Sequence, residues 1–566
     1  MKKINRNFFL LKKIPLNKKI YLLYIISFLL FVTFLDIVSI YFLANVIPNK
    51  PASITFDNSI FIKIISILNL DKDFDLYKLS VIIFMVSIIL RNIFSFFQQL
   101  SVNQFVYKEY AKYSYELLKT YVLSKPEKFF LKNYSYYLKN VIKETQNAFQ
   151  GILYATIYLT VDFIYLISIF IYILFFLVSD FSIELVLFLL ITFIIIIIFI
   201  LKLKKIGIVK SKNEEGVYKD AYETLLAFIE IKLIKHVDLF LNSFKKKIDK
   251  HSLMQVIYGA INSSLRPTLE ILVCLYILLF IFFDKNIYGN IYNLVLLLFL
   301  LFRFIPVLSR LSGNLNTISF HFESKHILNN EFKFYSSDKN KFDFEITEDV
   351  NLIKLKNLFF KYSNIRNSYK YLFSNFNLTL KKGFITGIYG DSGIGKSTLL
   401  LIISGLLRTN KGFYFINKKK ISEKKNINWN MKLSYMSQSS YLVDDSLKYS
   451  LFFDKDLANK INLINEARVL LKKFNLQHLI KFLENDYLNI SLRSTLSMGE
   501  KQRIAFIRCI LSKPQVLILD EPTASLDEKN EKILMNELLK IKKNCIIVMT
   551  THKKNLIKYF DKAINL

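Results

Sequence analysis

Residues 390–398 read Gly390-Asp391-Ser392-Gly393-Ile394-Gly395-Lys396-Ser397-Thr398. Apolar runs at 385–389 and 399–407 flank them, which predicts a strand, a glycine-rich turn and a helix in that order. Glycines let backbone N–H groups curl around phosphates, and the N-terminus of the helix adds positive potential. Lys396 suits the β- and γ-phosphates of a nucleotide, and the Ser397 hydroxyl suits Mg²⁺. We therefore predict that ATP and Mg²⁺ bind this turn, held by Gly390, Asp391, Ser392, Gly393, Gly395, Lys396, Ser397 and Thr398.

A pair of carboxylates ends a second apolar run further along the chain. Residues 516–519 are all apolar, and Asp520 and Glu521 follow directly. Asp520 at the strand end is placed to hold Mg²⁺ through water, and Glu521 is placed to polarise an attacking water. A salt-bridged surface pair would not require four apolar residues before it. The pair therefore predicts hydrolysis of the bound nucleotide.

A family resemblance becomes specific between these two motifs. Leu496-Ser497-Met498-Gly499-Glu500-Lys501-Gln502-Arg503 resembles the signature motif of ABC ATPases. Gln438 after the predicted strand 433–436 matches the Q-loop of that family, and Asp527 in Ser525-Leu526-Asp527 matches its D-loop. His552, after the predicted strand 545–549, matches the switch histidine, and Tyr362 matches the aromatic residue that stacks on adenine.

The resemblance implies a role for each matched residue. Glu521 would act as the general base and Lys396 would neutralise phosphate charge. Gln438 and His552 would sense the γ-phosphate. Gln438 would also join Ser397 and Asp520 at the Mg²⁺ ion.

The signature residues imply a dimer. In ABC proteins Ser497, Gly499, Glu500 and Asp527 would face the nucleotide held by another subunit. One chain carries one P-loop and one signature, so two complete sites require a head-to-tail pair. A second copy of the chain is the simplest closure, and a related half-transporter stays open as the partner. Met498 replaces the first glycine of the usual L-S-G-G-Q and Glu500 replaces its glutamine.

The first 330 residues have a different character. Six apolar runs stand there, most of them near the ~20 residues that a bilayer core requires: 20–46, 79–100, 151–178, 183–203, 269–283 and 291–308. We predict an α-helical transmembrane bundle of six spans, type I ABC exporter-like, followed by an α/β P-loop ABC ATPase domain. The predicted parts are residues 1–330, a linker at 331–347 and the ATPase domain at 348–566.

Charge and cysteine content narrow the class further. The net charge of +32 comes from 77 basic residues in which lysine far outnumbers arginine, so we read it as compositional bias and expect no nucleic acid partner. The N-terminus is basic, which predicts that it is cytoplasmic. The three cysteines have no C-x-x-C spacing and support neither a disulfide framework nor a zinc cluster. We expect an integral protein of the bacterial cytoplasmic (inner) membrane, in contact with membrane lipid, with no cleaved signal peptide and its ATPase domain in the cytoplasm.

Five ionisable residues fall inside the predicted spans: Asp36, Arg91, Asp162, Glu270 and Arg303. Charge inside a membrane is costly, so each is a functional candidate. A guanidinium group suits phosphate, so Arg91 and Arg303 are predicted to attract an anionic headgroup. The alternative is that Glu270 pairs with one of these arginines and only locks the bundle.

Short segments around Asp36, Arg91 and Arg303 resemble bacterial ABC exporters that flip lipid-linked oligosaccharides. The resemblance implies an ATP-driven exporter or flippase whose substrate is a polyprenyl-diphosphate glycan, moved outward. An exporter of peptide, lipid or drug stays open, as does a membrane regulator that uses ATP only as a switch. Residues 124–140 and 227–240 resemble the segments that couple the membrane spans of such exporters to the ATPase domain. The alternative is that these residues are amphipathic helices that only extend the spans.

Overall fold

The structure is a computed structural model. It describes residues 16–44, 76–177, 183–283, 291–336, 342–362, 371–421, 426–429, 431–443, 446–458, 460–484 and 495–566. The chain forms two compact units, one of Met1–Val122 and Lys132–Ser337, the other of Leu123–Leu131 and Asp338–Leu566. The sequence-based domain boundaries at 330 and 348 stay a prediction.

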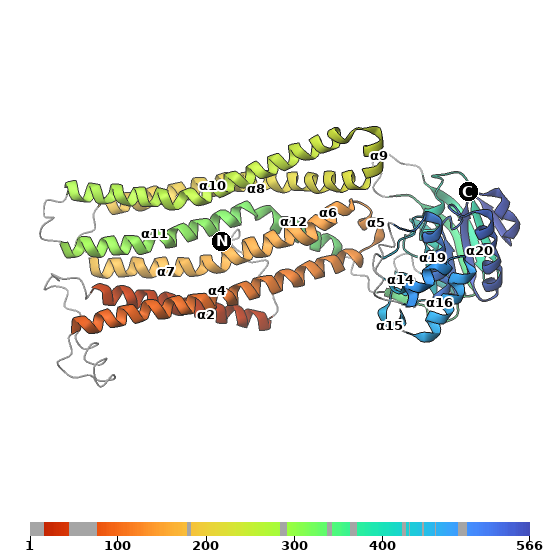
Figure 1. The fold of residues 1–566 in the computed structure, drawn as a ribbon, viewed down its shortest axis with the longest axis horizontal. Helices are drawn as coiled ribbons and strands as arrows, with labels where there is room; N and C mark the ends of the chain where they lie inside the picture. The colour runs from red at the N-terminus through yellow and green to blue at the C-terminus, as the bar shows by residue number, and fades with distance from the viewer. Residues whose placement is uncertain are drawn as a thin grey trace. The chain divides into compact units, whose positions relative to one another are not determined.

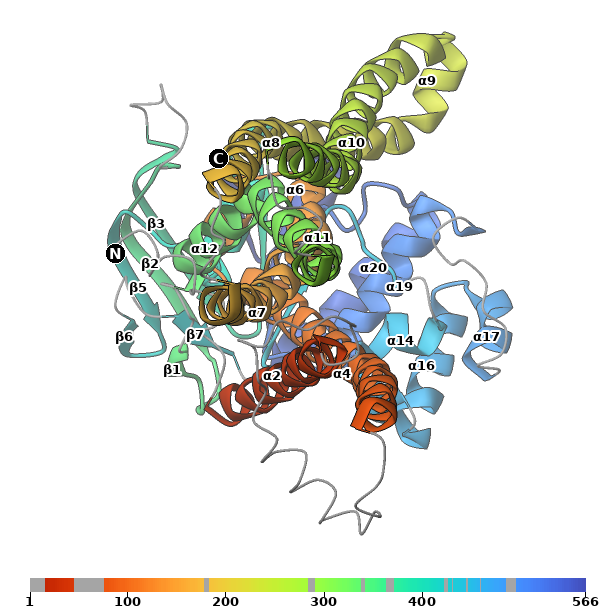
Figure 2. The ribbon, with the colours of Figure 1, turned by 90° about the vertical axis from the view of Figure 1, so that its left-hand side faces the viewer.

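The first unit is helical (Figure 1). Its long helices are α2 (Leu16–Ala44), α4 (Leu76–Val122), α7 (Tyr154–Leu177), α8 (Ile183–Leu226), α10 (Val237–Phe283) and α11 (Ile291–Phe320). Shorter elements are α6 (Tyr134–Leu138), the π-helical turns η2 (Lys139–Glu144) and η3 (Asn147–Leu153), α9 (Phe228–Ile234) and α12 (Phe322–Ser336). Figure 2 views these helices end-on and shows α2 beside α4 and α8 beside α10.

The helices extend well beyond the apolar runs that predict them. The predicted fifth span, 269–283, is only the last part of α10, which begins at Val237 and continues through Pro267. The predicted span 269–283 implies that Glu270 begins a helix; this is wrong, because Glu270 lies inside a long one. Among the described residues, two helical segments, Lys78–Val122 and Tyr134–Ile167, are long and apolar enough to cross a membrane. The count of six spans stays a prediction.

The second unit is built on a five-stranded parallel sheet in the order β11-β4-β10-β9-β8. Its strands are β4 (Ile385–Tyr389), β8 (Leu433–Met436), β9 (Val516–Leu519), β10 (Ile546–Thr551) and β11 (Lys562–Asn565). An antiparallel sheet in the order β3-β2-β5-β6 contains β2 (Leu352–Phe360), β3 (Phe373–Lys381), β5 (Lys411–Ile416) and β6 (Lys419–Ile421). A third, two-stranded sheet joins β1 (Phe342–Glu345) to β7 (Asn426–Asn428).

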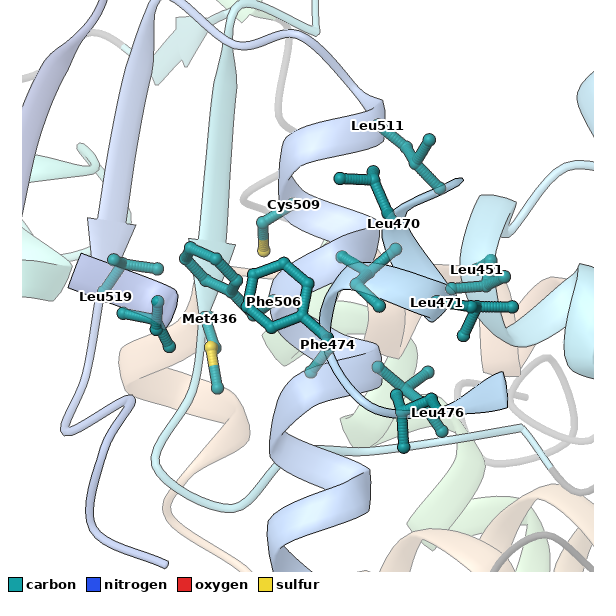
Figure 3. Close-up of a cluster of buried hydrophobic side chains, with 14 of the residues drawn as sticks. Met436, Leu451, Leu470, Leu471, Phe474, Leu476, Phe506, Cys509, Leu511 and Leu519 are labelled. Carbon is teal, nitrogen blue, oxygen red and sulfur yellow. The ribbon is translucent and has the colours of Figure 1, made fainter. Parts of the chain in front are cut away.

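Helices complete this unit. They are α5 (Pro126–Phe129), α13 (Lys396–Ile403), α14 (Leu447–Phe452), α15 (Lys455–Ala458), α16 (Ile461–Lys473), α17 (Ile480–Glu484), α19 (Met498–Leu511) and α20 (Glu528–Ile541), with 3-10 turns η6 (Gln477–Leu479), η7 (Lys542–Asn544) and η8 (Lys554–Tyr559). Phe506 of α19 packs between Phe474 and the strand residues Met436 and Leu519 in a fully apolar core (Figure 3). Burial of these rings helps to hold α19 against the sheet.

The predicted strands 385–389, 433–436 and 516–519 are confirmed residue for residue. The predicted strand 545–549 is present as β10, which begins one residue later and ends two residues later. The predicted helical run 399–407 is wrong at both ends, because α13 begins at Lys396 and ends at Ile403. Gly405 follows with φ +75°, a left-handed conformation that stops a helix.

The two predicted coupling segments differ in the unit to which they belong. Leu123–Leu131, which includes α5, belongs to the second unit, where the Arg408 backbone N–H donates to Glu127 Oε1 at 3.3 Å. The segment at 227–240 forms α9 and the start of α10 within the first unit. Phe228, Ile229 and Leu233 of α9 expose most of their side-chain surface in the chain.

Candidate functional site

Parallel strands bring the ATPase motifs to one edge of the sheet. β4 leads into Gly390, β8 into Gln438, β9 into Asp520 and β10 into His552. Since β4, β10, β9 and β8 are neighbours and run in the same direction, their carboxyl ends lie together. Residues more than 150 positions apart in the chain therefore share one site.

The turn after β4 has the backbone that glycine permits. Gly393 and Gly395 have φ values of +80° and +111°, a region that residues with a Cβ rarely adopt. Lys396, at the start of α13, curls back and its Nζ donates to the carbonyls of Gly390 at 2.9 Å and Asp391 at 3.0 Å. Ser397 is exposed at the N-terminus of α13, beside this turn. The loop and the start of α13 thus supply backbone N–H groups, an ammonium and an exposed hydroxyl, the groups that bind a polyphosphate.

Glu521 is the centre of a small network. Its Oε1 lies 2.7 Å from His552 Nε2, and its Oε2 accepts from Gln438 Nε2 at 3.0 Å. Lys396 Nζ lies 3.0 Å from His552 Nε2. Glu521 has φ +48°, an uncommon conformation for a residue with a side chain and one that clusters at functional sites. The structure thus brings the four predicted catalytic residues into contact.

Asp520 is held separately, behind Glu521. Its Oδ1 accepts from Thr550 Oγ1 at 2.7 Å, and Tyr435 OH lies 3.5 Å from its Oδ2. Burial and the Asp520 carboxylate raise the pKa of Tyr435 above its ordinary value, so the phenol stays a neutral donor. The sequence did not indicate Thr550 or Tyr435 as site residues, because each lies in a mainly apolar strand and was expected to belong to the hydrophobic core.

The donor atoms fit Mg²⁺. Ser397 supplies a hydroxyl oxygen, Asp520 a carboxylate and Gln438 an amide oxygen, and Mg²⁺ prefers hard oxygen ligands shared with substrate phosphates. The Nε2 of Gln438 is used by Glu521, which leaves its Oε1 as the atom for a metal. Tyr362 OH lies 2.9 Å from Thr398 Oγ1, which ties the predicted adenine-stacking residue to the P-loop helix.

The signature residues open α19. Ser497 caps the helix, accepting from Glu500 N at 3.3 Å, while Glu500 Oε2 accepts from Ser497 N at 2.8 Å. A Cβ on Gly499 would stand 2.8 Å from the Ser525 carbonyl, which explains the glycine at that position. Met498, the departure from the family pattern, is exposed.

The D-loop is joined to this helix. Gln502 Oε1 accepts from Ser525 N at 3.1 Å. Asp527 caps α20 through Asn530, and the Asn530 hydrogen bonds hold the pKa of Asp527 below its ordinary value. The predicted nucleotide residues therefore fall into two groups, one around Lys396 and Glu521 and one around Ser497 and Asp527.

The first unit encloses a cavity of about 480 Å³. Its lining includes two ion pairs, Arg91 with Asp36 at 3.1 Å and Arg310 with Asp162 at 2.9 Å, together with Tyr154, Tyr158, Tyr165 and several amide side chains. Arg310 was not a candidate because the predicted last span ends at 308, whereas α11 continues to Phe320.

The alternative in which Glu270 pairs with Arg91 and locks the bundle is wrong. Glu270 pairs with Arg266 one turn away at 2.9 Å, while Arg91 pairs with Asp36. The side chain of Arg303 lies outside the part of the chain that the structure describes.

Comparison with known proteins agrees with this geometry. The ABC transporter family model matches residues 373–524. A lipoprotein-releasing system ATP-binding protein, LolD of Buchnera aphidicola, is 32% identical over 223 residues, 36% of this chain and 92% of that protein. A probable ABC transporter ATP-binding/permease protein of Haemophilus influenzae is 29% identical over 221 residues, 39% of this chain.

The chain belongs to the ABC transporter family, and its second unit is the ATP-binding domain of that family, a nucleotide-binding ATPase. The match spans 38% of the length of the Haemophilus relative. A solved structure described as a bacterial Atm1-family ABC exporter with ATP bound superposes with a TM-score of 0.72 over 97% of this chain and 93% of that one, at 14% identity. That likeness shows the fold of the whole chain, a helical part followed by an ABC ATPase.

Proposed function

We propose that the protein is an ATP-driven membrane exporter or flippase. The observation that carries the proposal is a network in which Gln438 and His552 contact Glu521 and Lys396 contacts His552. The other unit of the same chain consists of long helices around a cavity lined by two ion pairs. Glu521 takes the proton of the attacking water, and Lys396 neutralises charge on the phosphates. Mg²⁺, when bound through Ser397, Gln438 and Asp520, supplies further charge neutralisation. His552 and Gln438 read the γ-phosphate through their contacts with Glu521.

We also propose that two such chains act together, as a homodimer or with a related half-transporter. Ser497 and Gly499 of one chain would then face the nucleotide on the other. The exposed apolar side chains of α9 support a partner, because clustered large apolar groups on a surface mark interaction sites. ATP would close the dimer and turn the cavity outward, and hydrolysis would reset it. We place the helices in a bacterial inner membrane and the ATPase in the cytoplasm.

For the cargo we propose a lipid-linked oligosaccharide or a related anionic lipid. In both cavity pairs the carboxylate is the more buried partner: exposed fractions are 28% for Arg91 against 9% for Asp36, and 49% for Arg310 against 4% for Asp162. The guanidinium groups therefore present donors to the cavity, as a phosphate requires. Arg303, the other predicted cargo residue, keeps that role as a hypothesis. Because Arg91 and Arg310 are each paired with an aspartate, a peptide, lipid or drug is the second candidate.

The test is ATPase activity of the protein in nanodiscs with and without polyprenyl-diphosphate-linked glycans, with Glu521→Gln as the blank. We expect the glycolipid to stimulate hydrolysis in the wild type and in the control Arg266→Ala, whose pair is exposed. We expect no stimulation in Arg91→Ala or Arg310→Ala. If the glycolipid does not change the rate of hydrolysis, the protein can still be an exporter, but its cargo would be a peptide or a drug. A wild-type rate equal to the blank would favour a regulator that only binds ATP.

A further inference from the structure

The signature helix carries a carboxylate with an unusual set of contacts. Glu500 Oε2 accepts from both the backbone N–H and the Oγ of Ser497, each at 2.8 Å. Its other oxygen, Oε1, lies 2.9 Å from His478 Nε2. His478 lies in η6, 22 residues before Glu500 in the sequence. A single carboxylate therefore connects an imidazole to the serine that caps the helix.

The position of His478 is set by the core of the second unit. Arg503 Nη1 donates to the Phe474 carbonyl at 3.0 Å, and Arg503 Nε donates to the Gly499 carbonyl at 3.3 Å. The Phe474 and Phe506 rings pack 5.5 Å apart in the same core (Figure 3). The turn that carries His478 is thus anchored to α19, and the contact between His478 and Glu500 is a product of the fold.

Glu500 places a negative charge beside Ser497, the residue predicted to meet a phosphate. Burial raises the pKa of Glu500, but the Ser497 hydrogen bonds and the charges of His478 and Arg503 outweigh it and hold the pKa below its ordinary value. Glu500 is therefore ionised at neutral pH. An ionised carboxylate that holds the Ser497 hydroxyl repels a phosphate approaching that hydroxyl, whereas a glutamine amide at this position carries no charge.

We propose that His478 is a positioning residue of the signature motif: its contact with Glu500 Oε1 fixes the carboxylate on Ser497 and draws its negative charge toward Oε1, so that the γ-phosphate of a nucleotide on a second chain can approach Ser497. His478 itself contacts no reacting atom. The inference rests on the proposed head-to-tail dimer. It explains how this chain uses glutamate where the family pattern has glutamine.

The experiment is a double-mutant cycle on the full-length protein in nanodiscs. We would measure kcat and KM for Mg-ATP in His478→Ala, His478→Gln and His478→Lys, each with Glu500 present and in a Glu500→Gln background. Because His478 is half-exposed, we expect a rise in KM of about three- to fivefold for Ala with Glu500 present, and a smaller change in kcat. Gln and Lys keep an N–H donor for Glu500 Oε1, so they restore KM. With Glu500→Gln, the His478 variants should differ from their parent by less than about twofold.

Two outcomes overturn the inference. One is a rise in KM that is the same in both backgrounds and follows a lower unfolding temperature, because His478 then only stabilises the turn. The other is an unchanged KM in His478→Ala with Glu500 present. A wild-type ATPase rate no higher than that of Glu521→Gln would instead overturn the proposed function, and this inference with it.

Discussion

The two units of the chain distribute apolar and charged side chains in opposite ways. In the second unit Phe474, Phe506 and the whole of β9 are buried, and the charged groups of the site stand at strand ends. In the first unit large apolar side chains such as Ile82, Phe96 and Ile194 are exposed, while Asp36 and Asp162 are buried.

This contrast indicates the solvent that surrounds each unit. In water, apolar groups are buried and charges face outward. In lipid, apolar groups can cover the surface, and ionisable groups face the bundle interior, pair with one another and mark a pathway. The opposite pattern of the first unit therefore supports its placement in a membrane, and it makes the Asp36 and Asp162 pairs part of the cavity chemistry.

The largest effect on activity is expected from a substitution of Glu521, in the charged site of the second unit. Glu521→Gln keeps the shape of the side chain and removes the base, so ATP hydrolysis should fall by about 10²- to 10⁴-fold. ATP binding should persist, and the variant should accumulate as an ATP-bound closed dimer. ATPase rates and nucleotide-dependent dimerisation would measure this, with the exposed Glu528→Gln as control. Undiminished turnover would remove Glu521 from the role of base.

An effect of intermediate size is expected when an aspartate replaces an exposed apolar residue on each unit in turn. Ile194 on α8 is 55% exposed and Val469 on α16 is 63% exposed. Ile194→Asp should cost about 2.5–3.5 kcal/mol for insertion into a bilayer, whereas Val469→Asp at a water-facing site should change little. The yield of membrane-integrated protein and its unfolding temperature would measure both. Equal effects of the two variants would contradict the assignment of two solvents.

The smallest effect concerns an ion pair that holds the P-loop strand. Asp561 Oδ2 accepts from Ile385 N at 2.8 Å, and Asp561 pairs with Lys542 at 2.7 Å. Burial raises the pKa of Asp561, but these partners outweigh it and lower the pKa below its ordinary value. Asp561→Asn should cost roughly 1 kcal/mol at neutral pH, since part of the pair is exposed.

The pH dependence of that effect has a definite sign. A carboxyl whose folded-state pKa is depressed stabilises the fold above its unfolded pKa, about 3.9, and the stabilisation is lost as the pH falls through the folded value. The difference in unfolding temperature between wild type and Asp561→Asn should therefore shrink below about pH 4. A difference that grows on acidification would contradict this account.

The ATPase half was largely predictable from the sequence. The strands 385–389, 433–436 and 516–519 are short apolar runs that end at glycine or polar motif residues, so local pattern specifies their limits. The strands β1, β5, β6, β7 and β11 were not predicted. All of them are short, and β5, β6 and β11 are only partly buried. Thr550, Tyr435 and His478 were missed because each acts through a residue distant in the chain.

The helical half was predicted less fully. Apolar runs indicated helices, but α8 continues past its run to Leu226 and α10 begins well before its run, at Val237. Helical hydrogen bonds join residues four apart and do not stop where apolar side chains stop. For that reason Arg310 was left outside the predicted span and Glu270 was placed at a helix start.

The order of the ATPase motifs, the buried strands that carry them and the apolar character of the first unit could all be predicted from local sequence, since each depends on residues close together in the chain. The charge pairs could not be predicted in this way: Arg91 with Asp36, Arg310 with Asp162, and Glu500 with His478 are known from the fold alone. The physical reason is that a local pattern limits the conformations of a segment, whereas a pairing between distant residues depends on how whole elements pack.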